Sequence, residues 1–257
     1  MDLKLISQLR DKTGAGLNDC RTSLEEANGD LEMAVEIMRK KGEIKAAKKA
    51  DRATKEGVIA TAGDSARLAI VALACETDFV SRTEAFQQTV AELAGKLLAA
   101  TDVETFKTEA EAYIKNELTM KIGENMVIAG AGVFSGGLVG SYIHSNKKVG
   151  GVAVLSAGDK STADDIAMQI VAMNPKYLDP ASVPAEVLEK EKEIYREQLK
   201  SENKPEQIWD KIIAGKLNKF YEDNCLANQS FIKDEDKKIS DLLTDGAKIV
   251  DWARYSL

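Results

Sequence analysis

The sequence predicts an α+β protein in which antiparallel sheets are covered by helices, with further helical parts at the N-terminus and towards the C-terminus. Three observations support this. Residues 1–41 show only helical periodicity, and residues 183–222 are charged and helical on both sides of a break at 203–205. A strand–turn–strand–helix pattern begins at residue 57 and again at residue 137. The recurrence predicts a duplicated core.

The composition is typical of a globular chain. Of the 257 residues, 44% are hydrophobic and 30% are charged, which argues against disorder. No apolar run approaches the roughly 20 residues that span a bilayer. The first residues, Met1–Leu5, lack the basic start and long apolar stretch of a signal peptide. We therefore expect a cytoplasmic protein without a membrane partner.

The residues needed for most catalytic and metal sites are scarce. There are three cysteines (Cys20, Cys75 and Cys225) and one histidine, His144. No cysteine pair has metal-ligand spacing, so a disulfide framework, a zinc site or a two-histidine mechanism is not expected. Cys75 ends an apolar strand and is best interpreted as a small buried hydrophobe. We expect no metal, no cofactor and no catalytic residue, and hence a protein that is not an enzyme.

The glycines between residues 130 and 137 do not predict a nucleotide site. Their spacing differs from that of a dinucleotide-binding loop, and the residues that follow have the pattern of a strand where phosphate binding needs a helix. A phosphate loop of the Walker type is also absent.

The N-terminal part predicts three short helices within residues 1–41, followed by a basic connector over 42–56. In the third helix, Leu31, Ala34, Val35 and Met38 follow helical spacing. The net charge of the whole chain is −7, yet residues 39–55 carry eight basic and two acidic side chains. This segment could hold a phosphate backbone or could simply be a solvated helical linker.

The two halves of the predicted core have the same order of elements. Strands are expected at 57–62, 68–75 and 126–134 in the first half, and at 137–144, 149–155 and 249–255 in the second. Helices follow the second strand of each half, and further helices are expected at 103–121 and near 235–244. Residues 183–222 predict an antiparallel helical hairpin, since two amphipathic arms flank a tight break.

Thr77, Asp78, Phe79 and Val80 lie where an apolar strand ends and a helix begins. Thr77 or Asp78 could cap that helix. Phe79 and Phe86 are seven residues apart, so on one helix they share a face, and that spacing favours a core position for Phe79. Periodicity alone cannot distinguish a core phenylalanine from an exposed one that inserts into a partner.

Several segments are similar to the signatures of one family. They comprise residues 9–20, 26–30, 45–50, 76–80, 121–125 and 140–144. Together they resemble the elongation factor Ts family, the bacterial and organellar exchange factors that act on elongation factor Tu. The resemblance extends from residue 3 to about residue 255. Longer members continue into a C-terminal segment that also touches the partner, and nothing is carried over for that segment.

The resemblance implies a domain plan. Residues 1–55 correspond to a three-helix domain like the ubiquitin-associated domain, plus the basic linker, and residues 56–136 to the first core subdomain. The second core subdomain comprises 137–182 and 223–257, and it is interrupted by the projecting, coiled-coil-like hairpin 183–222.

The resemblance also implies a function, guanine-nucleotide exchange on elongation factor Tu during protein biosynthesis. In this family an Asp-Phe pair disturbs the magnesium and phosphate site of the GTPase, which here assigns Asp78 and Phe79, flanked by Thr77 and Val80. Secondary partner contacts are implied for four residues: Ile122, Gly123, Glu124 and His144. From spacing alone, His144 is a surface histidine.

Two alternatives come from other classes. Residues 1–41 could act as a general protein-binding adaptor of the ubiquitin-associated type, although that leaves the duplicated core without a role. The basic segment 39–55 could bind RNA, in which case affinity should fall steeply with salt. We expect elongation factor Tu, and no nucleic acid, as the direct partner.

Overall fold

The computed structural model describes residues 2–257, apart from the side chain of Lys45. The chain forms two compact units, each described by itself here. The first contains the chain up to Val133 with residues 145–149 and 255–257, and the second contains residues 134–144 and 150–254. Helices and antiparallel strand pairs make up both units, so the predicted α+β class is confirmed. The domain boundaries implied by the resemblance stay a prediction.

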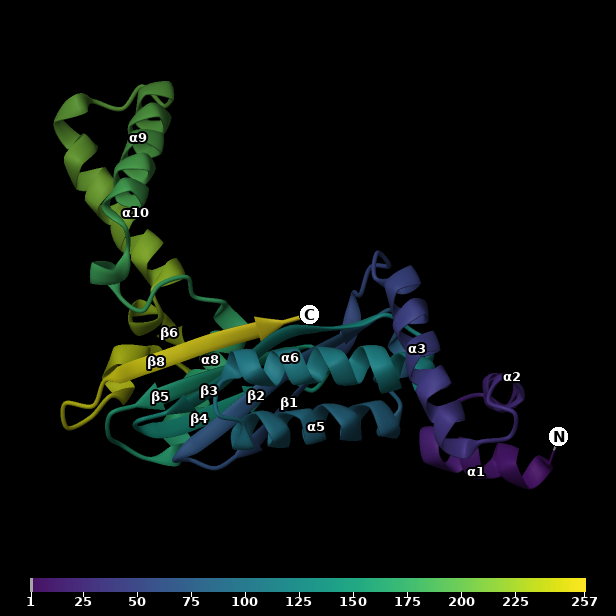
Figure 1. Ribbon diagram of the computed structural model, residues 1–257. Helices are drawn as coiled ribbons and strands as arrows, with labels where there is room; N and C mark the ends of the chain where they lie inside the picture. The colour runs from purple at the N-terminus through teal and green to yellow at the C-terminus, as the bar shows by residue number, and fades with distance from the viewer. Residues whose placement is uncertain (1) are drawn as a thin grey trace. The chain divides into compact units, whose positions relative to one another are not determined.

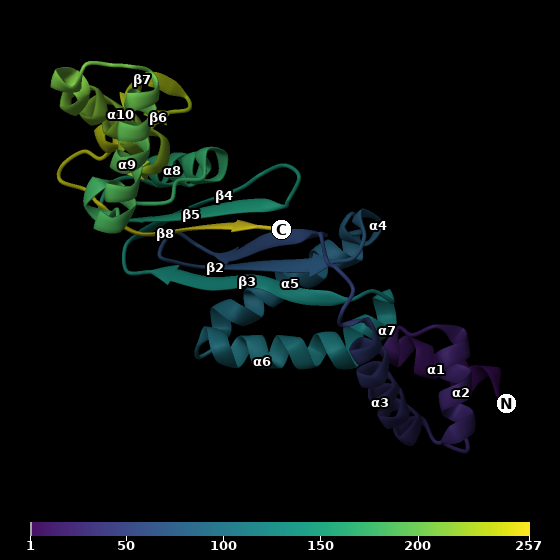
Figure 2. The same ribbon diagram turned by 90° about the horizontal axis from the view of Figure 1, so that it is seen from above.

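The N-terminal helices are α1 (Leu3–Thr13), α2 (Leu17–Glu26) and α3 (Leu31–Lys49), as Figures 1 and 2 show. The starts of α1 and α3 are capped by the carboxylates of Asp2 and Asp30, which accept from backbone amides of the first turn, whereas α2 begins after Gly16 without a side-chain cap. The buried side chains between them form one small core. It contains Ile6, Leu9, Ala15, Cys20, Leu24, Ala27, Ala34 and Met38.

Helix α3 does not end where the amphipathic pattern predicts. It continues through the basic connector to Lys49, because alanine and lysine both favour helix. Gly42 lies on this extension. A Cβ there would stand 3.1 Å from the Asn116 carbonyl oxygen and 3.2 Å from that of Lys115, so glycine allows the helices to approach closely.

The first unit is built on a three-stranded sheet with the order β1–β2–β3. Its strands are β1 (Glu56–Gly63), β2 (Arg67–Cys75) and β3 (Met126–Ser135). Strands β1 and β2 are antiparallel, with Glu56 opposite Cys75. All of β2 after Arg67 is buried, as its apolar run predicts.

Helices α5 (Glu84–Ala99) and α6 (Val103–Tyr113) run side by side over this sheet (Figure 1). Phe86 and Phe106 are buried in the core that they form with the strands. The helix expected over 103–121 is interrupted by a π-helical turn at Ile114–Leu118, before α7 (Thr119–Ile122) and the left-handed Gly123.

The second unit repeats the arrangement with the order β4–β5–β8. Its strands are β4 (Leu138–Ile143), β5 (Val149–Leu155) and β8 (Ile249–Ser256), and its covering helix is α8 (Lys160–Met173). Close approach of α8 depends on glycine. A Cβ at Gly140 would collide with the backbone of Ala163, and one at Gly151 would lie 2.6 Å from the Ala167 carbonyl oxygen.

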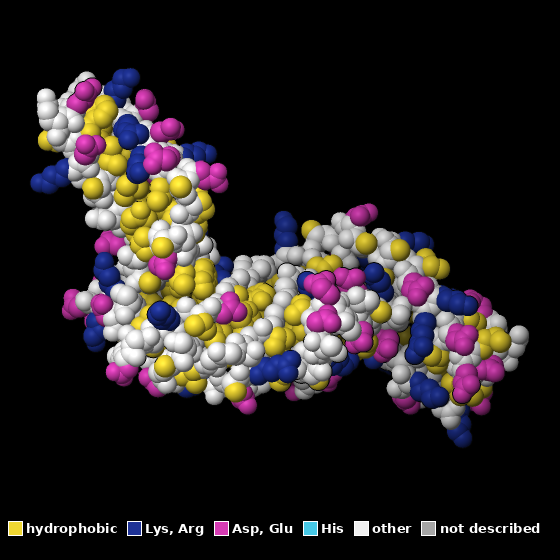
Figure 3. All heavy atoms as spheres, turned by 60° about the vertical axis from the view of Figure 1, so that its left-hand side comes forward, with side chains coloured by type: hydrophobic (Ala, Val, Ile, Leu, Met, Phe, Trp, Pro, Cys, Tyr) yellow, Lys and Arg dark blue, Asp and Glu magenta, His cyan; other side chains and the backbone are white. Residues whose placement is uncertain are grey.

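The helical hairpin consists of α9 (Ala185–Ser201) and α10 (Trp209–Asn224). Leu199 and Ile213 are buried in it, whereas Ile194 and Ile208 are exposed. Hydrophobic side chains line the arm in Figure 3. The hairpin therefore has an apolar seam with charged flanks.

One predicted helix is wrong. The segment near 235–244 forms strand β7 (Asp234–Lys238), paired with β6 (Ser230–Phe231), and a short 3₁₀ turn at Ile239–Leu242. A tight hairpin pairs Phe231 with Asp234, so the charged run becomes an exposed edge strand in place of a helix. Within residues 2–257, no helix combines the length and apolar character needed to cross a membrane.

Candidate functional site

The most exposed aromatic side chain described in the first unit is Phe79, at 82% exposure. It lies on α4 (Asp78–Ser81), a single turn just beyond the end of β2 (Figure 2). Phe86 belongs to a different helix and is only 1% exposed. The core interpretation of Phe79 is therefore wrong. Phe79 and Phe86 do not share a helix face because the helix breaks before α5. There the Thr83 hydroxyl caps the new helix by accepting from the Phe86 amide at 3.3 Å.

The other residues of the segment hold α4 in place. The Thr77 side chain caps the helix by accepting from the Val80 amide at 3.4 Å. Val80 is half-buried and packs against the core of the first unit. The Asp78 carboxylate pairs with Arg82 at 2.9 Å. Phe79 is the member of the predicted set that projects freely, with its neighbours turned to capping, packing and pairing.

Glu124 reaches this segment from a distant part of the sequence, just before β3. Its carboxylate accepts from the amides of Glu76 at 3.0 Å and Thr77 at 3.1 Å, and from the Thr77 hydroxyl. The resemblance implied a contact between Glu124 and a partner, whereas the structure gives its carboxylate three internal donors. Residue spacing could not predict these hydrogen bonds, because Glu124 and Thr77 are 47 positions apart in the sequence.

The residues next to Glu124 differ from one another. Ile122 is half-buried and packs against the core, while Gly123 is exposed with a φ of 85° and nothing within 4 Å of a Cβ placed there. The structure thus brings 122–124 and 77–80 together in one unit. His144 is exposed, follows the end of β4 and belongs to the second unit.

Cys75 lies directly beneath the segment and is buried. Burial, with a smaller contribution from the Glu124 carboxylate, raises the pKa of the Cys75 thiol to about 11. Its Sγ donates to the Thr77 carbonyl oxygen at 3.3 Å. The thiol is therefore protonated near neutral pH and serves as packing, which confirms its interpretation as a buried hydrophobe.

A polar hollow of about 420 Å³ lies beside α4 in the same unit. Asp78, Arg82 and the turn at 145–148 contribute to its walls. In it, Lys147 donates to Gln87 at 2.7 Å and Lys148 pairs with Glu56 at 2.5 Å. The charged groups beside α4 therefore already have internal partners.

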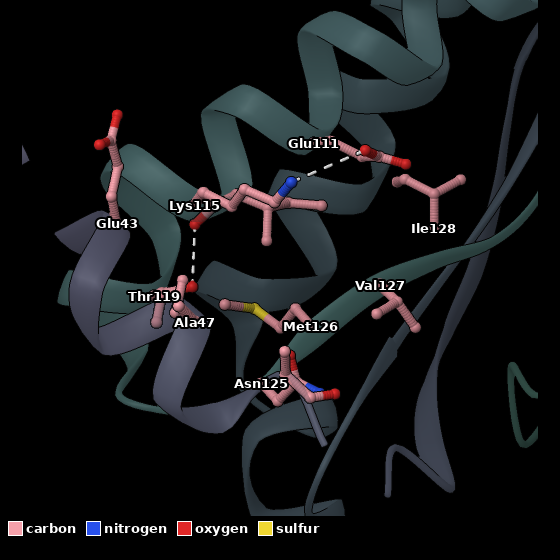
Figure 4. Close-up of a pocket in the computed structure, with 12 residues that line it drawn as sticks. Glu43, Ala47, Glu111, Lys115, Thr119, Asn125, Met126, Val127 and Ile128 are labelled. Carbon is pink, nitrogen blue, oxygen red and sulfur yellow. Dashed lines mark hydrogen bonds and ion pairs between the residues drawn. The ribbon is translucent and has the colours of Figure 1, made fainter. Parts of the chain in front are cut away.

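A second cavity, of about 470 Å³, lies between α3, the π-helical turn and β3 (Figure 4). Several of its polar groups have internal partners: Lys115 pairs with Glu111 at 3.9 Å, and the Thr119 hydroxyl donates to the Ile114 carbonyl oxygen at 2.9 Å. Alanine, isoleucine, methionine and valine side chains form much of the rest of the lining. None of Thr77–Val80 takes part in it.

The basic segment is partly engaged within the unit. Lys41 pairs with Glu26 at 2.8 Å, Arg52 pairs with Glu76 at 3.3 Å, and the Lys49 ammonium donates to the Gly123 carbonyl oxygen. Across residues 2–257, no three His, Cys, Asp or Glu side chains gather in a way that could hold a metal ion.

An exposed aromatic side chain on a helix that is anchored from several sides has the geometry of a protein-binding site. Comparison with known proteins gives the class and the family. The family model described as elongation factor TS matches residues 76–257. A curated elongation factor Ts from Nitratiruptor is 43% identical, covering 98% of this chain and 91% of that protein.

Other relatives agree. Elongation factor Ts of Nautilia profundicola is 42% identical over 98% of this chain and 91% of its own length, and that of Saccharophagus degradans is 39% identical over 98% and 90%. The protein is a translation elongation factor by class. The chain belongs to the elongation factor Ts family.

Proposed function

We propose that this protein is a guanine-nucleotide exchange factor that binds the GDP form of elongation factor Tu in the cytoplasm and promotes GDP release. The observation that carries the proposal is Phe79, which is 82% exposed on a short helix held by side chains on both sides. Truncation of a projecting aromatic anchor of this kind removes much of the energy of an interface.

The proposed mechanism needs no covalent chemistry. A GTPase holds GDP through a phosphate loop and a magnesium ion that neutralises phosphate charge, so disturbing the ion weakens the nucleotide. Phe79 supplies apolar area that inserts between elements of the GTPase and displaces those that hold the metal. Asp78, next to it, stabilises the displaced arrangement through its carboxylate.

Linkage sets what such a factor can do. If it binds the nucleotide-free GTPase more tightly than the GDP form, GDP must bind the complex more weakly by the same ratio. The factor therefore lowers affinity for both nucleotides, and cellular concentrations decide that GTP replaces GDP.

The four residues proposed as secondary contacts have different environments. Gly123 is exposed and has open space around its Cα, so a partner backbone can approach it. His144 is exposed and can contact another domain of the partner. The contacts proposed for Ile122 and Glu124 come from residues that also pack against the core and accept hydrogen bonds within the unit.

The test is release of labelled GDP from elongation factor Tu, with and without this protein. We expect clear stimulation by the native chain. At saturating concentration, Phe79→Ala should lower the stimulated rate by at least about tenfold, because the contacts of Phe79 stabilise the displaced arrangement and a loss of about 1.4 kcal/mol there is tenfold in rate. Val127→Ala is the matched control, because Val127 is also an exposed apolar residue of the first unit but lies outside this segment. No stimulation by the native chain, or equal rates for both variants, would contradict the proposal.

A further inference from the structure

The N-terminal end of α4 is held by a cluster of hydrogen bonds to which the proposed exchange mechanism assigns no role. We call Glu76, Glu124, Asn125 and Arg52 the anchor cluster. Two of its members follow Gly123, one follows β2, and Arg52 lies between α3 and β1. All four belong to the first unit, and Asn125 is seen at the start of β3 in Figure 4.

Helix α4 cannot fix its own position. It contains four residues, so it forms a single turn, and a single turn does not repay the cost of nucleating a helix in water. The exposed Phe79 adds no packing of its own, and the packing of α4 comes from Val80 and the buried Ser81 at its C-terminal end. The N-terminal end, which carries Phe79, therefore needs a separate hold.

Glu124 acts on the N-terminal end. The amides of Glu76 and Thr77 precede α4 and point at one carboxylate oxygen, at 3.0 and 3.1 Å, while the Thr77 hydroxyl donates to the other. Bonds from neutral donors to an ionised carboxylate are about twice as strong as neutral pairs. One side chain therefore fixes two consecutive peptide planes and the capping residue of α4.

The remaining members extend this hold to the end of the basic segment. The Glu76 carboxylate accepts from the backbone N–H of Asn125 at 2.6 Å and pairs with Arg52 at 3.3 Å. The Asn125 side chain is buried and donates to the carbonyl oxygens of Arg52 at 2.9 Å and Ala50 at 3.3 Å. The segment after α3, the start of β3 and the base of α4 thus share one set of hydrogen bonds.

We propose that Glu124 is a positioning residue for exchange: it presets the backbone of Glu76 and Thr77 so that α4 presents Phe79 in its binding-competent orientation. Its effect on exchange rests on the function proposed above, while its effect on the free protein does not. Without the carboxylate, the two amides turn to water and α4 samples several orientations. Only a fraction of molecules is then competent, and the apparent dissociation constant rises in inverse proportion to that fraction.

This role differs measurably from a direct contact. A positioning residue changes how often Phe79 is ready, so its loss raises the half-saturating concentration and leaves the maximal rate of GDP release almost unchanged. A residue that acts on the bound GTPase changes the maximal rate instead. Phe79→Ala provides the reference for the second behaviour.

The experiment compares Glu124→Ala, Glu124→Gln and the control Glu109→Ala in the full chain. Glu109 is an exposed glutamate on α6 of the same unit. Amide hydrogen exchange of the free protein is measured first. We expect Glu124→Ala to remove nearly all protection from exchange at Glu76 and Thr77 while the amides of β2 stay protected, since a binding-competent fraction of about one tenth leaves these two amides open most of the time. Glu124→Gln keeps one acceptor oxygen and should lie in between, and Glu109→Ala should match the native chain.

GDP release is then measured over a range of concentrations. Glu124→Ala should raise the half-saturating concentration about tenfold with the maximal rate retained. Unchanged amide exchange in a folded Glu124→Ala protein would overturn the positioning role, and a lowered maximal rate at unchanged half-saturation would show that Glu124 contacts the partner. If the native chain fails to stimulate GDP release while Glu124→Ala still loses amide protection, the proposed nucleotide-exchange function is wrong. The role of Glu124 in fixing the backbone of Glu76 and Thr77 then still holds.

Discussion

The two units contain the same hairpin-and-helix repeat but close it differently. In the first, eight residues (76–83) separate β2 from α5, whereas in the second only four (156–159) separate β5 from α8. The difference equals the four residues of α4. One repeat thus carries a projecting turn with an exposed phenylalanine at the position where the other proceeds directly into its covering helix.

The short connection in the second unit uses its polar groups locally. Gly158 adopts a φ of 118°, and the Asp159 carboxylate caps α8 by accepting from the Thr162 amide and hydroxyl, both at 2.9 Å. The long connection has two caps, Thr77 for α4 and Thr83 for α5, and depends on Glu124 from a distant segment. The same hairpin-and-helix repeat therefore carries a projecting helix where the connection is four residues longer and a side chain from a distant segment, Glu124, holds it in place.

The largest expected effect separates Phe79 from Phe86. Phe86→Ala removes a fully packed ring from the core, and it should lower the free energy of unfolding by about 3–5 kcal/mol. Phe79→Ala changes an exposed residue and should alter it by no more than about 0.5 kcal/mol. Urea unfolding of both variants measures the difference. Similar losses would mean that Phe79 is packed in solution and that the projecting turn does not exist there.

The second prediction concerns the close contact of α8 with its sheet. Gly140→Ala places a methyl group against the Ala163 backbone and should destabilise the protein by about 1–3 kcal/mol through overpacking. Gly95→Ala, on the exposed side of α5 with open space around it, is the control. It should stabilise by about 0.8–1.0 kcal/mol, since alanine is the better helix former. A Gly140→Ala protein as stable as the native chain would show that α8 can move away without cost.

The third prediction tests whether α4 and α5 are separate helices. Thr83 caps α5, so Thr83→Ala should lower the free energy of unfolding by about 1 kcal/mol. If the two helices were one, position 83 would be a helix interior, where alanine is favoured over threonine. A rise in stability on this substitution would therefore remove the break on which the exposure of Phe79 depends.

The smallest effect concerns acid stability at the cap of α8. Hydrogen bonds from the Thr162 amide and hydroxyl lower the pKa of Asp159 below its usual 3.8. A lowered folded-state pKa stabilises the protein above the ordinary pKa, and this contribution is lost as the pH falls through the folded value. Asp159→Asn keeps a capping oxygen but cannot titrate.

Melting temperatures of the native chain and Asp159→Asn, recorded between pH 5 and pH 2, measure this contribution. The native chain should lose slightly more stability than the variant below about pH 4. Thr83→Ala, which alters an uncharged cap, should leave the shape of the acid profile unchanged. Parallel profiles for the native chain and Asp159→Asn would show that the cap of α8 does not titrate with folding.

The sequence by itself determined most elements of both units. The apolar run of β2, the turn after it and the spacing of Val90, Leu93 and Leu97 predict a buried strand and its covering helix, and all are found. These features are local, since the residues that decide them are within one or two turns of each other. The signature motifs likewise carried the family resemblance without any structural information.

Specific contacts that periodicity does not record decided the rest. The charged run at 234–238 became a strand because Ser230 and Phe231 pair with it. Phe79 is exposed because a cap at Thr83 ends the helical face that periodicity assigned to it. Glu124 faces inward because a strand of the sheet begins beside the end of another, which brings together residues 47 positions apart. Periodicity records which side chains can be buried together within one element, and it contains no term for contacts between elements.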